Sequence, residues 1–396
     1  MAWGPTGYHT RPPSGNQATG GLPWAVTPLL KFATSPIRDL CLDLLWCGLW
    51  CGTFCCGLAA GSAAGEEDEA SIEGRWLSSL RQVTSDFVKA GEGYFSPDGQ
   101  TIVFQAVPQG YPFYQIFTQP LDGTAPPRRL STGRGRTTCA YFHPEGRQVI
   151  FASGHLDPQL AATEGAARRE ADEDRRHGRR RRYQWVFDPH MEIFRSDLAG
   201  GDLVRLTDSP GYDAECAFSP DGRQIVFCSD RDGDPDLYIM QADGSGVRQL
   251  TNQPGYDGGP FFSPDGNWIV FRTDRQRKDH LQIHVIRADG QHEVALTDNL
   301  GVNWAPYWHP RQPYIIWCGA DHRDPKARPN YDLWLMQYHL QDGQLVKGPV
   351  WRITDHPAAD VLPVFSPDGS QLMWTSNRTA DGTSQLWIAD FVLPAS

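Results

Sequence analysis

Residues 218–227 read Phe218-Ser219-Pro220-Asp221-Gly222-Arg223-Gln224-Ile225-Val226-Phe227: an aromatic residue, a turn and then an apolar run. Pro presets the backbone of the turn, Asp bonds the local backbone, and Gly accepts a positive φ, so the chain reverses direction here. The β-branched and aromatic residues after the turn favour a buried strand. The stretch therefore predicts a tight hairpin between two buried strands.

The same pattern occurs six times along the chain. The other copies begin at Phe95, Phe142, Phe262, Trp308 and Phe365, so successive copies are 47, 76, 44, 46 and 57 residues apart. A period of about 40–50 residues with four short strands per unit is typical of a β-propeller blade. His143 and His309 replace the Ser of the turn in two copies, and we expect them to be structural.

A second repeated motif predicts how the ring closes. Six outer strands with sequences related to Arg248-Gln249-Leu250-Thr251 are recognisable, and the first, Arg81–Thr84, precedes the first turn motif. No outer strand follows the last third strand, Gln385–Ile388. The early strand should therefore complete the last blade, which closes the ring and removes exposed sheet edges. An open stack of sheets is the alternative; we predict a closed, all-β, six-bladed propeller over residues 77–392.

The residues around the third and fourth repeats resemble a known family. TolB-like six-bladed propellers are built from WD-like β-propeller repeats. Two stretches of this chain are similar to those repeats: Ser229–Gly244, and Arg248–Asp257 leading into Phe262–Gly266. The resemblance implies a non-catalytic interaction module without a cofactor. It also implies an envelope protein as partner, such as a peptidoglycan-associated lipoprotein or a Tol-type transport component.

Composition and the N-terminal sequence bear on location. The net charge of −11 argues against nucleic-acid binding. Residues 1–38 form a low-complexity leader, 39–64 an apolar segment, and 65–76 an acidic linker. The apolar segment predicts either a cleaved signal peptide or an anchor, with 40–64 long enough to tether the chain to the inner membrane. We therefore expect an exported or periplasmic monomer.

One candidate binding site uses the same position in four repeats. In a propeller, the connections from second to third strand, and from one blade to the next, share one face, here called the loop face. Five residues before the turn aromatic, four successive repeats carry a carboxylate or amide: Asp213, Asp257, Asn303 and Asp360. Grouped around the mouth of the channel, such residues could hold a cation. Alternatively, each one bonds its own loop.

A second candidate site is the insertion at 155–190, between the second and third strands of the second blade. Leu160–Glu170 predicts a short helix, and a run of arginines follows: Arg175, Arg176, Arg179, Arg180, Arg181 and Arg182. Such a run can dock an acidic partner or an anionic polymer on the loop face. A solvated loop whose charges are balanced by neighbouring acids is the alternative.

Some residues would also suit an enzyme. His155, His190 and His322 lie near the loop face, and three histidines can bind a catalytic metal. The alternative function is thus a metal-dependent enzyme or sensor acting on acidic carbohydrate, like the lyases among related propellers. The sequence contains neither Gly-x-Ser-x-Gly nor a Gly-rich phosphate loop. Cys216 and Cys228 flank one hairpin and are either buried thiols or a disulfide.

Overall fold

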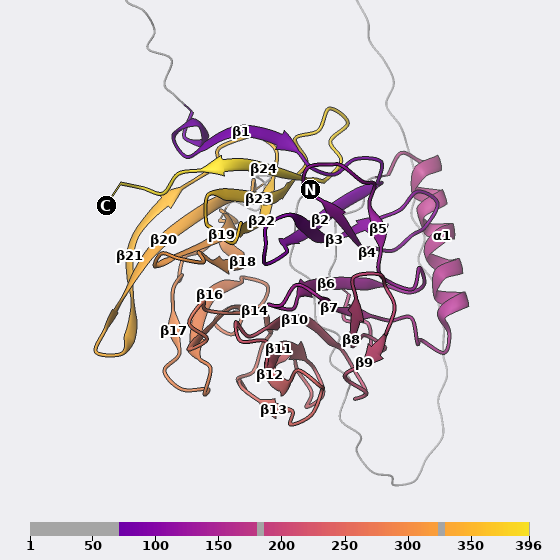
Figure 1. Cartoon of the computed structure of the whole chain (residues 1–396), viewed down its shortest axis with the longest axis horizontal. Helices are drawn as coiled ribbons and strands as arrows, with labels where there is room; N and C mark the ends of the chain where they lie inside the picture. Colours follow the sequence, from indigo (N-terminus) through magenta and orange to yellow (C-terminus); the bar gives the residue numbers. More distant parts are fainter. Residues whose placement is uncertain (1–70, 180–185, 324–328, 396) are drawn as a thin grey trace, which may run out of the picture. The chain divides into compact units, whose positions relative to one another are not determined.

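Six four-stranded antiparallel sheets form the fold of this protein (Figure 1). The computed structural model describes residues 71–179, 186–323 and 329–395. We number the sheets as blades 1 to 6 along the chain, and the first strand of each blade lies innermost, around a central channel. The predicted all-β, six-bladed propeller is therefore confirmed.

The strands follow the repeats read in the sequence. From the innermost strand outward they are, in blade 1, β2 (Lys89–Phe95), β3 (Thr101–Val107), β4 (Gln115–Pro120) and β5 (Arg128–Arg129); in blade 2, β6 (Thr137–Phe142), β7 (Gln148–Ser153), β8 (Glu192–Asp197) and β9 (Val204–Arg205); in blade 3, β10 (Asp213–Phe218), β11 (Gln224–Ser229), β12 (Asp236–Gln241) and β13 (Arg248–Gln249); in blade 4, β14 (Asp257–Phe262), β15 (Trp268–Thr273), β16 (Gln282–Arg287) and β17 (Val294–Ala295); in blade 5, β18 (Val302–Trp308), β19 (Tyr314–Ala320), β20 (Asp332–Gln341) and β21 (Gln344–Arg352); and in blade 6, β22 (Asp360–Phe365), β23 (Gln371–Ser376), β24 (Gln385–Phe391) and β1 (Leu77–Gln82).

The turn motif works as its residue types predict. In blade 3, the Ser219 hydroxyl donates to Asp221 at 2.6 Å and accepts from the backbone N–H of Gln224 at 2.9 Å. Gly222 has a φ of 71°, a left-handed value that costs glycine little. Each turn thus satisfies its own polar groups, which leaves the apolar residues on both sides free to be buried between blades.

Blade 6 contains both ends of the propeller. β1 pairs antiparallel with β24, with Leu77 opposite Phe391 and Gln82 opposite Trp387. Leu77 is buried in the same apolar cluster as Phe391. The early outer strand therefore completes the last blade, and the prediction of a closed ring is confirmed.

The two histidines in the turn motif connect neighbouring blades. The His143 ring packs on Phe218 with centroids 4.8 Å apart, and its Nε2 lies 3.3 Å from the Gly222 carbonyl oxygen of blade 3. The His309 ring packs in the same way on Phe365 of blade 6, at 4.7 Å. Both rings thus contact the turn of the next blade, which supports the structural role expected for them.

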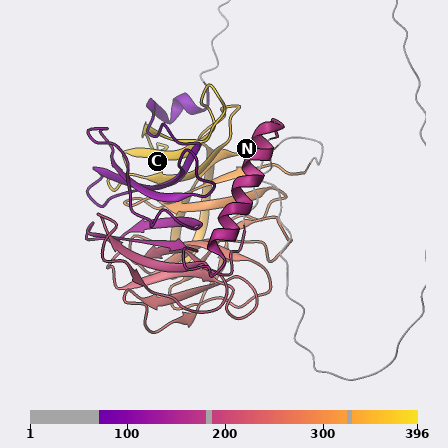
Figure 2. The same ribbon diagram turned by 90° about the vertical axis from the view of Figure 1, so that its right-hand side faces the viewer.

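Two short helices stand outside the blades. The 3₁₀-helix η1 (Glu73–Arg75) precedes β1, and α1 (Leu160–Arg176) lies in the insertion of blade 2, alongside blades 1 and 2 (Figures 1 and 2). The helix predicted at Leu160–Glu170 is present and extends six residues further. Neither described helix has the length and apolar character needed to cross a membrane. The leader and the apolar segment 39–64 lie outside the described residues.

Candidate functional site

Every innermost strand has a bulge at the same place. The residue three positions before the turn aromatic adopts a left-handed backbone, with φ between 47° and 59°, next to a shift of register: Glu92, Cys139, Glu215, Gly259, Ala305 and Leu362. A bulge changes the direction of a side chain relative to a regular strand. Because all six blades share the feature, the bulge belongs to the fold, and the residue types at these positions decide what the channel can bind.

Residues of all six blades line one cavity at the centre of the ring. The cavity encloses about 1010 Å³ of non-atom space, part of it open solvent. The ring of Tyr94 lies 5.6 Å from that of Phe261 and 6.1 Å from that of Tyr307, so aromatic side chains form its floor toward the turns. Asn377 and Ser384, from blade 6, line it toward the loop face.

A buried ion pair occupies one wall of this cavity. Glu215 accepts hydrogen bonds from Arg272 Nη2 at 2.8 Å, from the Tyr256 hydroxyl at 2.7 Å, from the Gly259 N–H at 2.6 Å and from the Tyr212 hydroxyl at 3.1 Å. A buried carboxylate is tolerated only when it is paired and hydrogen-bonded in this way. The lone pairs of Glu215 are therefore engaged by the protein itself.

Glu92 provides a second carboxyl group to the same cavity, with fewer partners. The Tyr94 hydroxyl donates to it at the long distance of 3.5 Å, and an exposure of 9% leaves Glu92 little contact with water. Burial, the largest cause, raises the pKa of Glu92 to about 7; the Cys139 thiol and Arg272 oppose the rise and Glu215 adds to it. The cavity thus contains a carboxyl group that exchanges its proton near neutral pH.

The four residues predicted at the channel mouth are buried, and each is the first or second residue of its strand. Asp213 pairs with Arg231 at 3.0 Å, Asp257 with Arg275, and Asp360 with Arg378 at 2.7 Å. Asn303 donates to Gln282 and Asn299 and accepts from the Trp317 indole. These partners lie within the propeller, and the four side chains are not part of the cavity lining. Ligand binding by them stays a prediction.

A buried carboxylate on α1 links the insertion to the loop face. Glu164, on α1, accepts from Arg134 Nε at 2.8 Å and from the Tyr111 hydroxyl at 2.8 Å. Arg175 donates to Asp172 on the same helix at 2.8 Å, so part of the predicted basic run is locally paired. Arg176 and Arg179 are exposed. Arg180, Arg181 and Arg182 lie outside the described residues.

The three candidate metal-binding histidines have separate partners. His155 Nδ1 lies 2.9 Å from the Ser153 hydroxyl, His190 Nε2 lies 3.6 Å from Asp157, and His322 Nε2 lies 3.1 Å from the Tyr331 hydroxyl. The structure does not bring them into one group. The metal-dependent alternative stays a prediction, tested by whether purified protein holds stoichiometric metal that the changes His155→Ala and His190→Ala remove.

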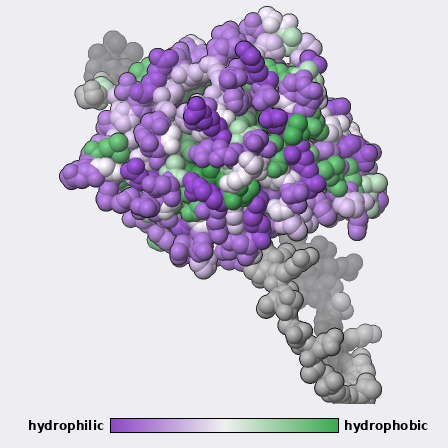
Figure 3. Space-filling view, turned by 60° about the horizontal axis from the view of Figure 1, so that its bottom comes forward, coloured by the Kyte–Doolittle hydropathy of each residue, from purple (hydrophilic) through white to green (hydrophobic). Residues whose placement is uncertain are grey.

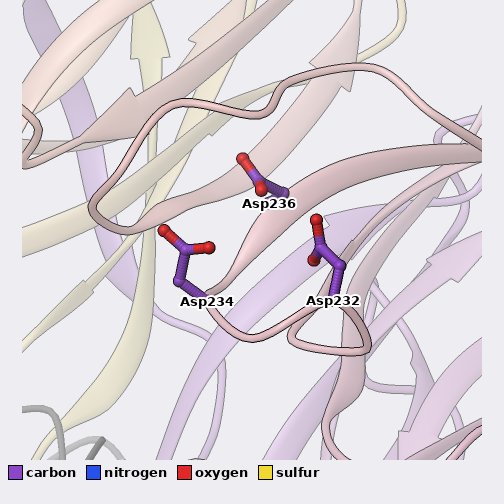
Figure 4. Close-up of side chains that lie close together, drawn as sticks. All are labelled: Asp232, Asp234 and Asp236. Carbon is purple, nitrogen blue, oxygen red and sulfur yellow. The ribbon is translucent and has the colours of Figure 1, made fainter. Parts of the chain in front are cut away.

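In the described part of the chain, three aspartates lie close enough to share a cation. Asp232, Asp234 and Asp236 follow one another along the loop into β12 (Figure 4), with carboxylate oxygens within 4.8 Å of one another. Burial, the largest cause, raises the pKa of Asp236 to about 7. Each carboxylate already accepts a bond from the protein, for instance the one that Gly255 N–H donates to Asp234 at 3.1 Å. These donors explain the cluster without a metal.

The cavity is lined by a different position of the repeat from the one predicted at the channel mouth. The predicted residues stand five places before the turn aromatic, and the residues that line the cavity stand three places before it. In the same alignment of repeats, Glu92 and Glu215 are the two carboxylic acids at this position, and the other four residues are Cys139, Gly259, Ala305 and Leu362. The bulge that directs them inward has no separate sequence signal, because five of the six residues are not glycine.

All four described cysteines are buried free thiols.

Comparisons with known proteins point to one type of propeller. The family model described as the TolB beta propeller domain matches residues 185–256. The Tol-Pal system protein TolB of Syntrophus aciditrophicus is 41% identical over 59 residues, 15% of this chain and 13% of that protein. That of Bordetella pertussis is 51% identical over 45 residues, 11% of this chain and 10% of that protein. The matched segment thus spans only about a tenth of the curated relatives.

A solved structure extends the likeness over the ring. It is named as a TolB of Agrobacterium tumefaciens, and it superposes with a TM-score of 0.52 at 20% identity, covering 79% of this chain and 97% of that chain. At this identity, the likeness shows the fold alone.

Proposed function

We propose that this six-bladed β-propeller, which carries a segment similar to the TolB beta propeller domain, acts as a non-catalytic protein-interaction scaffold of the cell envelope. The partner would bind the loop face, where the insertion of blade 2 adds a surface that the repeat itself does not provide. Fold alone leaves the function open, because propellers serve many roles. The proposal therefore depends on the features of this face.

The observation that carries the proposal is the attachment of α1 to the propeller. Its buried Glu164 receives three donors, the third being the Gly135 N–H at 3.3 Å, and Arg168 lies over the Tyr111 ring at 5.8 Å. A helix that served only as a solvated connection would not need a buried carboxylate that accepts three hydrogen bonds from the propeller. The attached helix displays exposed charges of both signs, such as Arg169 and Glu173, suited to a charged protein partner.

The names of the relatives support a partner class. Those matched in sequence are named as TolB of the Tol-Pal system. We propose for this chain an exported, periplasmic location and an envelope protein as partner, such as a peptidoglycan-associated lipoprotein or another Tol-type component. Figure 3 shows one face of the molecule, on which hydrophilic residues predominate and hydrophobic residues lie among them.

The test is affinity capture from an envelope extract with the full chain as bait. The variant carries Arg175→Glu and Arg176→Glu, which reverses two charges at the end of α1. The control is Arg223→Glu, whose side chain is 83% exposed in a turn on the opposite face. We expect one envelope protein to be enriched by wild type and control, and at least tenfold less by the variant.

Equal capture by all three baits would move the partner surface away from α1 and contradict the proposal in its present form. Absence of any specific envelope partner from the wild-type bait would contradict the scaffold function itself. Direct titration of the captured protein against each purified bait then measures the affinity, since a rim charge changes the association rate and its salt dependence.

A further inference from the structure

Glu92 and Glu215 face the same cavity but differ in what the protein offers them. Glu215 receives four donors, including the guanidinium of Arg272, at 2.6 to 3.1 Å. For Glu92 the described contacts are the distant Tyr94 hydroxyl and the weakly donating thiol of Cys139. A carboxylate taken out of water needs a cation or several good donors. The channel therefore has an acid whose ionised form lacks a matching cation.

The surroundings of Glu92 favour a cation of a particular kind. Tyr94, Phe261 and Tyr307 form the floor of the cavity, and the Phe261 and Tyr307 rings lie 5.1 Å apart. Aromatic faces attract ammonium groups and also contact the attached alkyl chain. An anion would find Arg272 already occupied by Glu215 and Tyr256. The net charge of −11 further favours the approach of cations.

We propose that the central channel binds an organic ammonium group, with Glu92 as its counter-ion and the aromatic floor of Tyr94, Phe261 and Tyr307 against the ammonium group. The group can belong to a free alkylamine or to a lysine side chain of a protein. The proposal goes beyond the scaffold function and does not depend on it, because a free amine can occupy the channel of a protein that has no partner.

Binding at this site is coupled to a proton. Around Glu92 stand Glu215 on β10 and Arg272 on β15, together with Cys139 on β6, Tyr94 on β2 and the nearby Tyr114. With a pKa of about 7, Glu92 is about half protonated at pH 7. A bound ammonium group favours the carboxylate, so Glu92 releases about half a proton per ligand at this pH. Below pH 7, affinity falls as protons compete with the amine.

The experiment is calorimetric titration of the full chain with three probes at pH 7, in two buffers of different ionisation enthalpy. The probes are hexylamine, its neutral analogue 1-hexanol, and the peptide acetyl-Ala-Lys-Ala-amide. Wild type should bind at least one amine roughly tenfold tighter than hexanol and release about half a proton. Glu92→Gln keeps the shape of the side chain and should lose both the preference and the proton release.

The control is Glu145→Gln, an exposed acid in a turn on the opposite face, which changes the net charge equally and should behave as wild type. If Glu92→Gln fails to fold, the wild-type protein alone tests the proposal. Its affinity for the amine should fall by roughly a hundredfold from pH 8 to pH 5. The stronger amine identifies the source of the group, free amine or lysine side chain. No preference for amines over hexanol, or equal binding at pH 5 and pH 8, would overturn the proposal and leave the scaffold proposal unaffected.

Discussion

Glu92 and Glu215 occupy the same position in blades 1 and 3, and their neighbours give them different properties. Both lie on a bulge with a left-handed backbone, at φ of 47° and 55°. Glu215 meets Arg272 and two tyrosine hydroxyls, whereas Glu92 meets an apolar and weakly donating environment. At the residue scale, the properties of each carboxyl group in the channel are thus set by the side chains that the neighbouring blades place around it.

The raised pKa of Glu92 predicts a pH dependence of stability. The folded pKa of about 7 lies above the ordinary value of 4.5, so the folded state holds a proton that the unfolded state has lost between these values. The free energy of unfolding therefore falls as pH rises through this window, by about 3 kcal/mol. The Glu92→Gln variant has no carboxyl group to lose this proton. Its free energy of unfolding, measured with urea, should therefore rise by about 3 kcal/mol relative to that of wild type between pH 4.5 and pH 8. A constant difference would contradict the buried, protonated carboxyl.

The paired aspartates at the start of the strands make a second prediction. Asp360 is fully buried and accepts from Trp374 Nε1 at 3.0 Å and from Arg378 at 2.7 Å. Asp360→Ala leaves both donors buried without this acceptor, so the free energy of unfolding should fall by about 3–5 kcal/mol. The exposed Asp298→Ala is the control and should change it by less than about 0.5 kcal/mol. An unaltered stability would favour a ligand-binding role for Asp360 over the structural one.

At the scale of elements, the formation of α1 can be predicted from its sequence, whereas its position depends on contacts with the propeller. Its sequence is rich in Ala, Glu and Arg, which are strong helix formers. Asp157 accepts from Gln159 N–H at 2.7 Å ahead of the first turn. Its position on the loop face, however, depends on Glu164 reaching Arg134, Tyr111 and Gly135, which come from two other connections.

The change Glu164→Ala should release α1 from the propeller without unfolding it. We expect faster amide hydrogen exchange over residues 160–176, by roughly tenfold or more, with unchanged exchange in the blades. Glu173→Ala, an exposed residue of the same helix, is the matched control. Unchanged exchange in α1 would show that Glu164 does not hold the helix, and would remove the main support for α1 as part of a docking surface.

At the scale of the whole molecule, the ring is held closed by the pairing of β1 with β24. Leu77 is 9% exposed and packs in the cluster that contains Phe391, while Leu80 on the same strand is 40% exposed. Leu77→Ala should lower the free energy of unfolding by about 2–3 kcal/mol, and Leu80→Ala by less than 1. Both are measured by urea unfolding of the full chain. Equal effects of the two changes would indicate that closure does not depend on this packing.

The sequence by itself determined the number of blades, the place of each turn and the closure of the ring, because turns and short strands are local structures with local residue requirements. It also predicted α1 and the structural role of the two turn histidines. Only the tertiary structure decided the candidate site. The cavity collects single residues from six blades far apart in the chain, and the bulges that direct them inward leave no mark in residue type. Likewise, the carboxylate at Asp213, Asp257 or Asp360 was visible, but the arginine that pairs with it was known only once the strands were placed side by side.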